Sequence, residues 1–563
     1  MSLEQIADKV VETDVLVVGG GIAGCPAAAK AAEHGLKVTL IEKSKTDRSG
    51  SAGQGIDHYG SFPRGGLTVL ALEKQWDEMG MANAGGTGLW VDPNISYRIF
   101  DNHFWALEEL EKLGATMKWD DGEYYWAPHL VRGIKNGLRV HWQNVKPELT
   151  AAMKERGVNV INRTMIVDLL TNNGAVTGAT AVNTRTGDFI VIKAKAVIMA
   201  TGNFARCYNP ETPLFWKYKF NYHWCPATCA GDGFAAAYRG GAELVNMEIA
   251  GWGHRIRDDK TISMGNFMVG DGIPCKTLTW TGDEVITGGP QKTAELEQEG
   301  LDPIYLSLEH LPDDYHKRME IAYADERMVS FKVAEDRGFN PRTHWYHSMP
   351  NAPHQFDLIP GVFIDEDFKA STLKGLYAVG TVGAALGGCH GAAVSGLLIG
   401  DSISNFVSGV ADPAVDEAQV ENQKQTALAP MSVKDGTEPV ELECAIRYIC
   451  ERYVGMFRSE GKLREGLRRL GSLRRVFLPR LMAQNPHHLM RCLEVRNILD
   501  LADVHIQACL DRRETRGCHI RLDHPAEDPS RDNMLTFQRI EDGKPVLEIR
   551  KIPGLKPEYA KEG

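Results

Sequence analysis

The sequence has no apolar run long enough to cross a membrane, since none approaches the ~20 residues that a spanning helix needs. Its first residues, MSLEQ, also lack the basic-then-apolar order of a secretory signal. Positive charge is in deficit, with 63 Lys and Arg against 74 Asp and Glu and a formal charge of −11. Because binding of nucleic acid needs a basic surface, this composition argues against such a partner. We expect a cytoplasmic protein without a membrane span.

Cysteine is scarce and poorly spaced for a metal site. The 11 cysteines are an odd number scattered over 563 residues, which fits reduced thiols better than a disulfide framework. Apart from Cys225/Cys229 and Cys444/Cys450 no two lie close together, and no CxxC pattern exists to ligate an iron–sulfur cluster. We therefore expect no metal and no cluster in this chain, and place any such cluster on another chain.

What the sequence does have is a nucleotide-binding signature near its start. The apolar run 15–18 precedes the pattern Gly19-x-Gly21-x-x-Gly24, and a second apolar run ends at Glu42. A buried strand, a tight turn, a helix start and an acid about 20 residues further on form a βαβ unit that binds an adenine dinucleotide. Backbone N–H groups and the helix dipole hold its pyrophosphate, and the acid holds a ribose.

A second stretch of small residues, 48–55, follows this unit. It is too rich in glycine for a regular helix or strand, so we expect its backbone to lie close against a bound ring. That placement favours a flavin over a nicotinamide. The cofactor residues expected from this part of the chain are Lys43, Ser49, Gly50, Gln54 and Gly55.

The α/β pattern is interrupted and then resumes. Residues 151–203 are predicted to be strands and turns that end in Ala200, Thr201 and Gly202, and 375–380 repeats that pattern before an apolar helix opens at 387–396. The predicted fold class is α/β, a Rossmann-type FAD-binding domain with an inserted α+β capping domain and a helical C-terminal domain. The predicted boundaries are 1–246 and 351–412 for the two parts of the FAD-binding domain, 247–350 for the capping and substrate domain, and 413–563 for the C-terminal domain. Its clearest helices are 441–457 and 488–512, followed by a strand-like tail at 534–552.

Together these motifs resemble the fumarate reductase and succinate dehydrogenase flavoprotein family. The motifs that carry the resemblance are the first glycine turn, Arg48-Ser49-Gly50 with Gln54-Gly55, Ala200-Thr201-Gly202, 375–380, His390-Gly391-Ala392 and 514–525. Within the family the chain is most similar to the adenylylsulfate reductase alpha subunits, which share Arg-Ser-Gly at 48–50. The resemblance implies a catalytic flavoprotein subunit that carries out a two-electron reduction of a small molecule. It also implies a ferredoxin-like iron–sulfur partner, and it leaves open a homo-oligomer.

The resemblance also implies how FAD is held. Relatives that attach FAD covalently use a histidine at the position of Gly50, and glycine offers no nucleophile, so non-covalent FAD is implied. The late cofactor residues implied by the family motifs are Gly380, Thr381, Ser395 and Gly396, with Thr381 in place of an acid that usually contacts the ribityl chain.

The same comparison bears on the substrate. Fumarate reductases follow His-Gly-Ala-Asn with an arginine that clamps a carboxylate, whereas Ala393 and Val394 follow here, so succinate and fumarate are poor candidates. Adenylylsulfate stays open, although Gly60 replaces an asparagine of the sulfur enzymes. His390 resembles the family histidine near the flavin and can donate or accept a proton. The further candidates are Arg255 or Arg257 for the substrate, and Tyr59 and Trp252 as aromatic walls.

Those aromatic walls favour an alternative function, reduction of a C=C bond in an uncharged or aromatic compound; a second alternative is a non-catalytic electron-transfer flavoprotein. Two stretches stay ambiguous. The aromatic run 215–224 either lines the cofactor cleft or belongs to an ordinary core. The arginines between 464 and 480 either dock an acidic iron–sulfur partner or pair with local acids such as Glu460 and Glu465.

Overall fold

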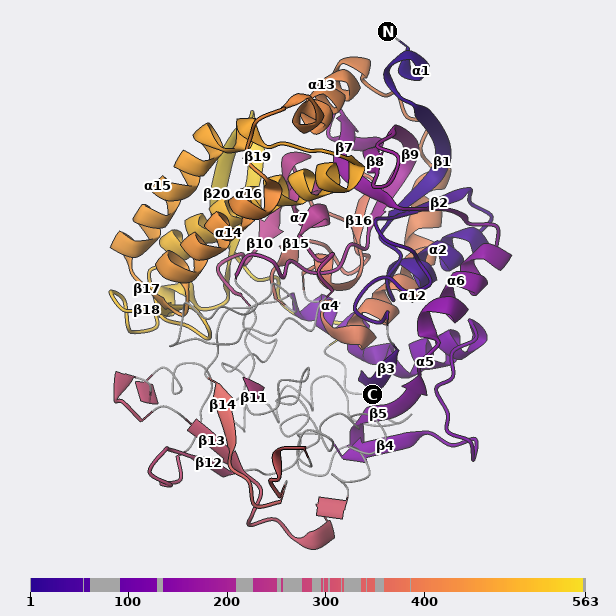
Figure 1. Ribbon diagram of the computed structural model, residues 1–563. Helices are drawn as coiled ribbons and strands as arrows, with labels where there is room; N and C mark the ends of the chain where they lie inside the picture. Colours follow the sequence, from indigo (N-terminus) through magenta and orange to yellow (C-terminus); the bar gives the residue numbers. More distant parts are fainter. Residues whose placement is uncertain are drawn as a thin grey trace.

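The centre of the computed structural model is a seven-stranded sheet with the order β6-β2-β1-β9-β8-β7, in which β16 also pairs with β9 (Figure 1). Its strands are β1 (Lys9–Val18), β2 (Val38–Glu42), β6 (Asn159–Asn162), β7 (Thr164–Asn172), β8 (Ala175–Asn183), β9 (Phe189–Met199) and β16 (Leu376–Ala378). The structure describes residues 2–53, 55–60, 92–128, 135–208, 226–250, 255–256, 276–285, 295–296, 298–301, 304–314, 316–317, 336–340, 342–349, 359–384 and 386–559.

The apolar run 15–18 forms the buried end of β1, the central strand. Val15 pairs in parallel with Val38 of β2 on one side and with Ala196 of β9 on the other. Strand β16 is also parallel to β9, while β7 and β8 run antiparallel. Because parallel strands end at the same edge, the segments after Val18, Glu42, Met199 and Ala378 meet there. The predicted α/β class is confirmed.

Helices surround this edge of the sheet. Helix α2 (Gly24–Glu33) packs against both α6 (Val145–Glu155) and the long α12 (Gly388–Ser408), and α12 also contacts α5 (His103–Lys112) and α4 (Pro93–Asp101). Helix α7 (Asp232–Arg239) lies against β7. The helix predicted to open at 387–396 is confirmed by α12, whereas the strands predicted from residue 151 begin only after α6 ends at Glu155.

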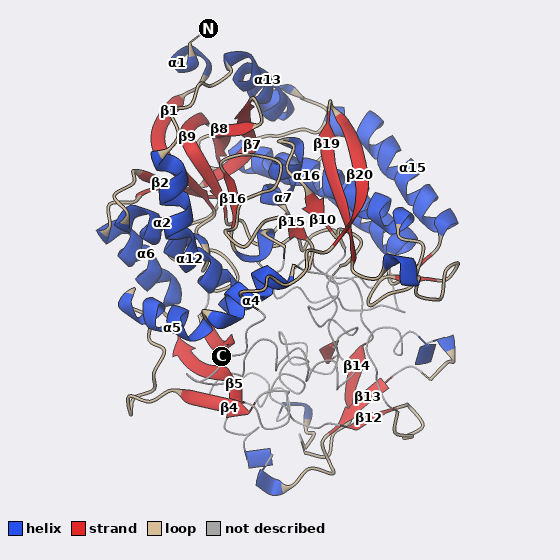
Figure 2. Cartoon of the chain, turned by 180° about the vertical axis from the view of Figure 1, so that it is seen from behind, coloured by secondary structure: helices blue, strands red, loops and turns tan. Residues whose placement is uncertain are grey.

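The C-terminal part is largely helical, as predicted (Figure 2). Its helices are α13 (Glu417–Leu428), α14 (Pro439–Ile449), α15 (Glu460–Val476) and α16 (Pro486–Asp511). The helix predicted over 441–457 is shorter, since α14 passes into a π-helical turn at Cys450–Val454 and a strand, β17 (Phe457–Arg458). The predicted tail strand is a hairpin of β19 (Met534–Glu541) and β20 (Lys544–Lys551) that joins β10 (Leu244–Val245) and β15 (Gly361–Val362).

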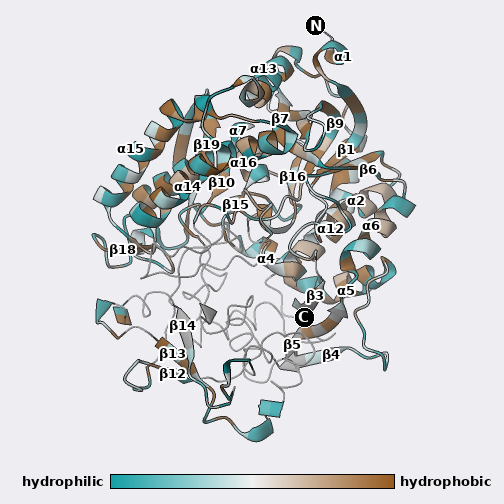
Figure 3. Ribbon diagram, in the orientation of Figure 1, coloured by the Kyte–Doolittle hydropathy of each residue, from teal (hydrophilic) through white to brown (hydrophobic). Residues whose placement is uncertain are grey.

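Helix α15 alternates hydrophilic and hydrophobic positions, and its basic residues are largely satisfied locally (Figure 3). Arg464 pairs with Glu460, and both Arg468 and Arg469 pair with Glu465 at 2.7 Å. This confirms the local pairing that the spacing allowed. Docking of a partner on this helix stays a prediction.

Two smaller sheets lie beyond the strand ends. One joins β3 (Ile56–Gly60), β5 (Lys135–Trp142) and β4 (Tyr125–Pro128), and the other joins β11 (Arg255–Ile256), β14 (Tyr346–Met349), β13 (Ile304–Ser307) and β12 (Lys276–Leu278). The second sheet lies within the segment predicted as the capping domain, 247–350, whose boundaries stay a prediction. No helix in the described ranges is both long and apolar enough to span a bilayer.

Candidate functional site

The glycine turn between β1 and α2 is packed on one side and open on another. Gly19 has a φ of +101°, and a Cβ atom there would lie 2.5 Å from the carbonyl oxygen of Ala200. At Gly24 a Cβ atom would overlap the carbonyl oxygen of Gly19. At Gly21, by contrast, a Cβ atom would meet nothing within 4 Å. The turn therefore combines close packing onto β9 with an open face at Gly21.

Glu42, at the end of β2, lies against this turn. Its Oε2 accepts a hydrogen bond of 2.8 Å from the amide of Gly20, and its Oε1 accepts one of 2.6 Å from the amide of Ser44. The residue is buried, with 7% of its surface exposed. Since each carboxylate oxygen can accept more than one hydrogen bond, Glu42 keeps acceptor capacity for ribose hydroxyls.

The second glycine-rich segment approaches the same turn. Ser49 donates through Oγ to the carbonyl of Gly20 at 3.3 Å, and a Cβ atom on Gly50 would lie 3.3 Å from Cα of Gly21. Gly55 lies against the backbone of Gln143, where a Cβ atom would be 2.8 Å away. Ser49 and Gly50 thus border the open face, while Gln54 lies outside the described residues.

The ends of β9 and β16 complete this edge. A Cβ atom on Gly202 would lie 4.0 Å from Oγ1 of Thr381, so these two predicted residues come together. Oγ1 of Thr201 is buried and has no hydrogen-bond partner within the described part of the chain. An orphaned polar atom at a strand end, next to an open glycine turn, is what a site for a bound nucleotide needs.

Two of the predicted cofactor residues hold α12 in place. Ser395 accepts a hydrogen bond of 3.0 Å from the amide of Gly380, while its hydroxyl donates to the carbonyl of Gly391 at 2.7 Å. A Cβ atom on Gly396 would overlap the carbonyl oxygen of Ala23. Direct contact of these residues with a cofactor stays a prediction; the structure shows that they dock α12 against the glycine turn.

The side chain of Lys43 points into a buried ion-pair network. Its Nζ lies 2.6 Å from Asp232 and 2.8 Å from Glu494, and it donates to the carbonyl of Thr228 at 2.6 Å. Burial alone would lower the pKa of Lys43, but the two carboxylates raise it above its usual value. A cofactor contact from Lys43 therefore has to come from its backbone.

His390 lies in the first turn of α12, between a glycine and a second histidine. A Cβ atom on Gly60 would lie 2.6 Å from Nδ1 of His390. The ring of His103 meets the His390 ring edge-on, with centroids 4.9 Å apart and an interplanar angle of 77°. Burial, and then His390, lower the pKa of His103 well below its usual value, so this imidazole is neutral. The position of His390 is thus restricted from two sides.

Tyr59 precedes Gly60 on β3 and is fully buried. Its hydroxyl has no hydrogen-bond partner among the described residues, and burial raises the pKa of the phenol well above its usual value. Ala393 and Val394, which follow the histidine motif on α12, are also fully buried. No cationic side chain stands at these two positions to clamp a carboxylate.

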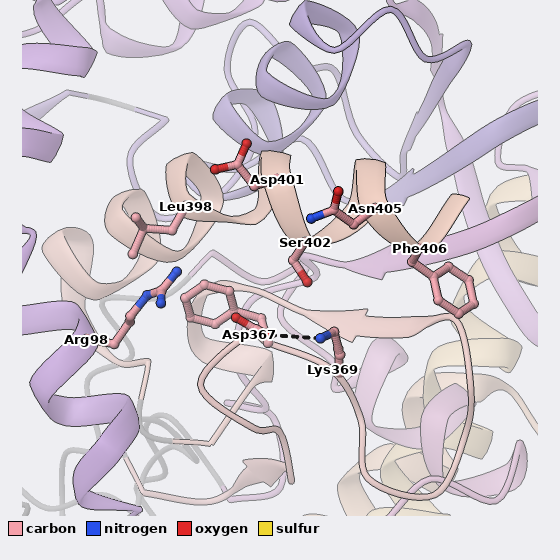
Figure 4. A pocket seen from close by; sticks show the side chains of 9 residues that line it. Arg98, Asp367, Lys369, Leu398, Asp401, Ser402, Asn405 and Phe406 are labelled. Atoms are coloured by element: carbon pink, nitrogen blue, oxygen red, sulfur yellow. Dashed lines mark hydrogen bonds and ion pairs between the residues drawn. The ribbon is translucent and has the colours of Figure 1, made fainter. Parts of the chain in front are cut away.

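The remaining predicted substrate residues lie outside this description. Trp252 and Arg257 fall outside the described residues, as does the aromatic run 215–224. Arg255 is described through its backbone, which pairs with Met349 in β14. A separate pocket of about 250 Å³ opens along the later turns of α12, between Arg98 of α4 and the ion-paired Asp367 and Lys369 (Figure 4). None of the predicted site residues lines it.

Sequence reasoning missed His103 and Lys146, which both contact site residues. Lys146 stands four residues before Thr150 and three before Leu149, on the buried face of α6. A lysine in the apolar stripe of an amphipathic helix was therefore a signal that the sequence offered. No such pattern marks His103, because its contact with His390 joins distant segments.

Known proteins match this chain over nearly its whole length. A subunit of the fumarate reductase (CoM/CoB) of Methanothermobacter marburgensis is 25% identical, with 94% of this chain and 98% of that protein covered. L-aspartate oxidase of Yersinia pestis is 23% identical, with 91% and 96% covered. Several family members with different substrates are thus about equally similar.

Solved structures share the fold. Adenylylsulfate reductase from Archaeoglobus fulgidus has a TM-score of 0.82 at 24% identity, covering 97% of this chain and 96% of that one. A variant E. coli quinol fumarate reductase has a TM-score of 0.77 at 20% identity, covering 99% and 100%.

Two family models match the parts of the chain that build the site. The FAD binding domain model matches residues 14–254, and the fumarate reductase flavoprotein C-terminal model matches 445–553. The chain belongs to the fumarate reductase and succinate dehydrogenase family of FAD-dependent oxidoreductases.

Proposed function

We propose that this chain is the catalytic flavoprotein subunit of a reductase, which carries out a two-electron reduction with non-covalently bound FAD. The observation that carries the proposal is the position of His390, in the first turn of α12 and restricted by Gly60 and His103. FAD, when bound, supplies the electron pair. The described residues fit it, because the open face at Gly21, the acid Glu42 and the orphaned Oγ1 of Thr201 border one edge of the sheet.

Non-covalent attachment rests on Gly50, which offers no nucleophile. Acid precipitation of the purified holoprotein tests it directly. We expect the flavin absorbance to stay entirely in the supernatant. Flavin retained in the washed protein pellet would show a covalent link and contradict this part of the proposal.

In this proposal His390 supplies or removes the proton that accompanies reduction of the substrate. An imidazole titrates close to neutral pH, so it can exchange a proton at little cost. The variant His390→Ala should keep its FAD, measured by absorbance, and lose about a hundredfold or more of its turnover with reduced viologen as electron donor. Unchanged turnover would contradict the role of His390.

The substrate pocket in this proposal differs from those of the relatives. Ala393 and Val394 leave the carboxylate clamp of a fumarate reductase unfilled, and His390 occupies the space that a side chain at position 60 would need. We therefore expect little turnover of fumarate. Adenylylsulfate and an uncharged unsaturated compound are the two acceptors to compare, with reduced viologen as donor in each assay.

The buried and unpartnered hydroxyl of Tyr59 favours the uncharged compound as second candidate, since the described wall offers an aromatic ring and no cation. Turnover of an enone without turnover of adenylylsulfate would select it. A holoprotein that reduces no acceptor would instead support a non-catalytic electron-transfer role.

Electrons reach the flavin, in this proposal, from a ferredoxin-like iron–sulfur protein on a separate chain. Within the described residues no cluster of three metal-ligating side chains occurs. Reduction of the bound FAD by a reduced two-cluster ferredoxin, followed by absorbance, tests the idea; a flavin that stays oxidised would contradict it. The cytoplasmic location and a homo-oligomer stay predictions.

A further inference from the structure

Lys146 is a fully buried lysine directly behind the glycine turn. It stands in the first turn of α6, which packs against α2, and its side chain is excluded from solvent. Nζ donates a hydrogen bond to the carbonyl oxygen of Gly20 and lies 3.4 Å from Sγ of Cys25. The ammonium group is therefore held at the back of the segment whose front is open at Gly21.

This ammonium has no carboxylate as ion-pair partner within the described part of the chain. Burial raises the pKa of the Cys25 thiol, so that sulfur stays protonated and does not neutralise the lysine. Glu42 is turned to the other side of the same residue, where it accepts from the amide of Gly20 at 2.8 Å. An isolated buried cation is costly, which calls for an anion on the one side that stays open.

The hydrogen bond of Lys146 also orients the backbone. In a trans peptide the C=O of one residue and the N–H of the next point in opposite directions. The carbonyl of Gly20 is held towards Lys146, Ser49 and Cys25, the last two with bonds of 3.3 Å. The amide N–H of Gly21 consequently points away from these three side chains. Helix α2, which begins three residues later, has no side-chain cap at its N-terminus.

We propose that Lys146 is a cofactor-binding residue that acts through the glycine turn. Its charge compensates the diphosphate of FAD, and its hydrogen bond to Gly20 holds the amide of Gly21 towards that diphosphate. Both effects add to the uncapped N–H groups and dipole of α2. The inference rests on the proposed FAD site, and it assigns the lysine a role that neither the glycine pattern nor Glu42 supplies.

Binding to the apoprotein tests this inference without any catalytic assay. Lys146→Gln keeps a donor for the carbonyl of Gly20 and removes the charge, while Lys146→Met removes both. Lys154→Gln, an exposed position of the same helix, is the matched control. We expect the Kd for FAD to rise about tenfold or more in Lys146→Gln and further in Lys146→Met, with no change in the control. A rise of less than about threefold in both variants would overturn the inference.

The melting temperature of the apoprotein provides a second readout. Because the variants remove an uncompensated buried charge, we expect the apoprotein to melt at the same temperature as the wild type or higher. An apoprotein destabilised by both substitutions, or unable to fold with either, would show a purely structural lysine and overturn the inference.

Two nucleotide probes locate the effect at the diphosphate. ADP carries that group and adenosine lacks it, so the substitutions should weaken binding of ADP and leave adenosine unchanged. Equal losses for both probes would contradict the assignment. The proposed reductase activity can fail independently, since a wild-type chain that binds FAD and reduces no acceptor still decides the role of Lys146 by binding. A wild type without affinity for FAD would overturn both proposals.

Discussion

Gly60 and His390 are in such close contact that a Cβ atom on the glycine would lie 2.6 Å from Nδ1 of the imidazole. Real Cβ atoms essentially never approach a heavy atom so closely. On the adjacent side His390 meets the ring of His103, which is 2% exposed. A residue as small as glycine is therefore a condition for the observed position of the histidine.

Gly60→Ala should consequently displace the imidazole and lower turnover by about tenfold or more, because proton transfer depends on placement within a fraction of an ångström. FAD content should stay at the wild-type level, since the glycine turn is untouched. Gly461→Ala is the control, because a Cβ atom there meets nothing within 4 Å. Wild-type turnover in Gly60→Ala would contradict this prediction.

Gly396→Ala should separate α12 from the glycine turn. A Cβ atom at this position would overlap the carbonyl oxygen of Ala23, which is backbone and has no rotamer to change. We expect a loss of about 1–3 kcal/mol in the free energy of unfolding, together with weaker FAD binding. Gly471→Ala, on the surface helix α15, meets only the flexible end of Arg475 and should gain up to about 1 kcal/mol. Thermal melts with and without FAD compare the two; equal effects would contradict the packing argument.

Lys43→Met should destabilise the fold rather than act mainly on cofactor binding. The substitution leaves Asp232 and Glu494 buried beside an apolar side chain, which costs about 3–5 kcal/mol when a buried pair is broken. Lys45→Met removes an exposed pair with Asp47 and should cost less than about 1 kcal/mol. Urea denaturation of both variants measures the difference. A larger loss in Lys45→Met than in Lys43→Met would contradict the structural role.

These contacts show what the sequence could and could not predict. The glycine turn, the strands and Glu42 were predictable because a βαβ unit is encoded by spacing within about 30 residues. Pairs on one helix, such as Arg469 with Glu465, follow from the period of 3.6 residues. Both kinds of prediction depend on neighbours that are close in the chain.

The contacts of Lys43 could not be predicted in this way, since Asp232 and Glu494 lie 189 and 451 residues further on. Reading the residue after Glu42 as a cofactor contact was reasonable from local spacing alone. The direction of its side chain depends on where α7 and α16 pack, which no local pattern specifies. The same holds for His103, whose partner His390 stands on another helix.

Acid should destabilise the fold through its buried histidines, of which His505 is the clearest. Its Nε2 lies 2.6 Å from the hydroxyl of Tyr208 and its Nδ1 lies 2.6 Å from the carbonyl of Met247. Burial, and then Arg458, lower the pKa of His505 to about 3. Below the unfolded value of about 6.5 the unfolded chain therefore binds a proton that the folded chain refuses, so stability falls as pH decreases towards 3.

Between pH 7 and pH 5 this one group should remove about 2 kcal/mol of unfolding free energy, at ~1.4 kcal/mol per pH unit below 6.5. His505→Gln should be less stable than the wild type at pH 7, because it loses the contact with Tyr208, yet lose less stability on acidification. The exposed His487→Gln should follow the wild-type curve at both pH values. Urea midpoints at pH 7 and pH 5 measure the slopes. A slope in His505→Gln as steep as that of the wild type would mean that His505 takes up its proton in the folded state, against the burial that surrounds it.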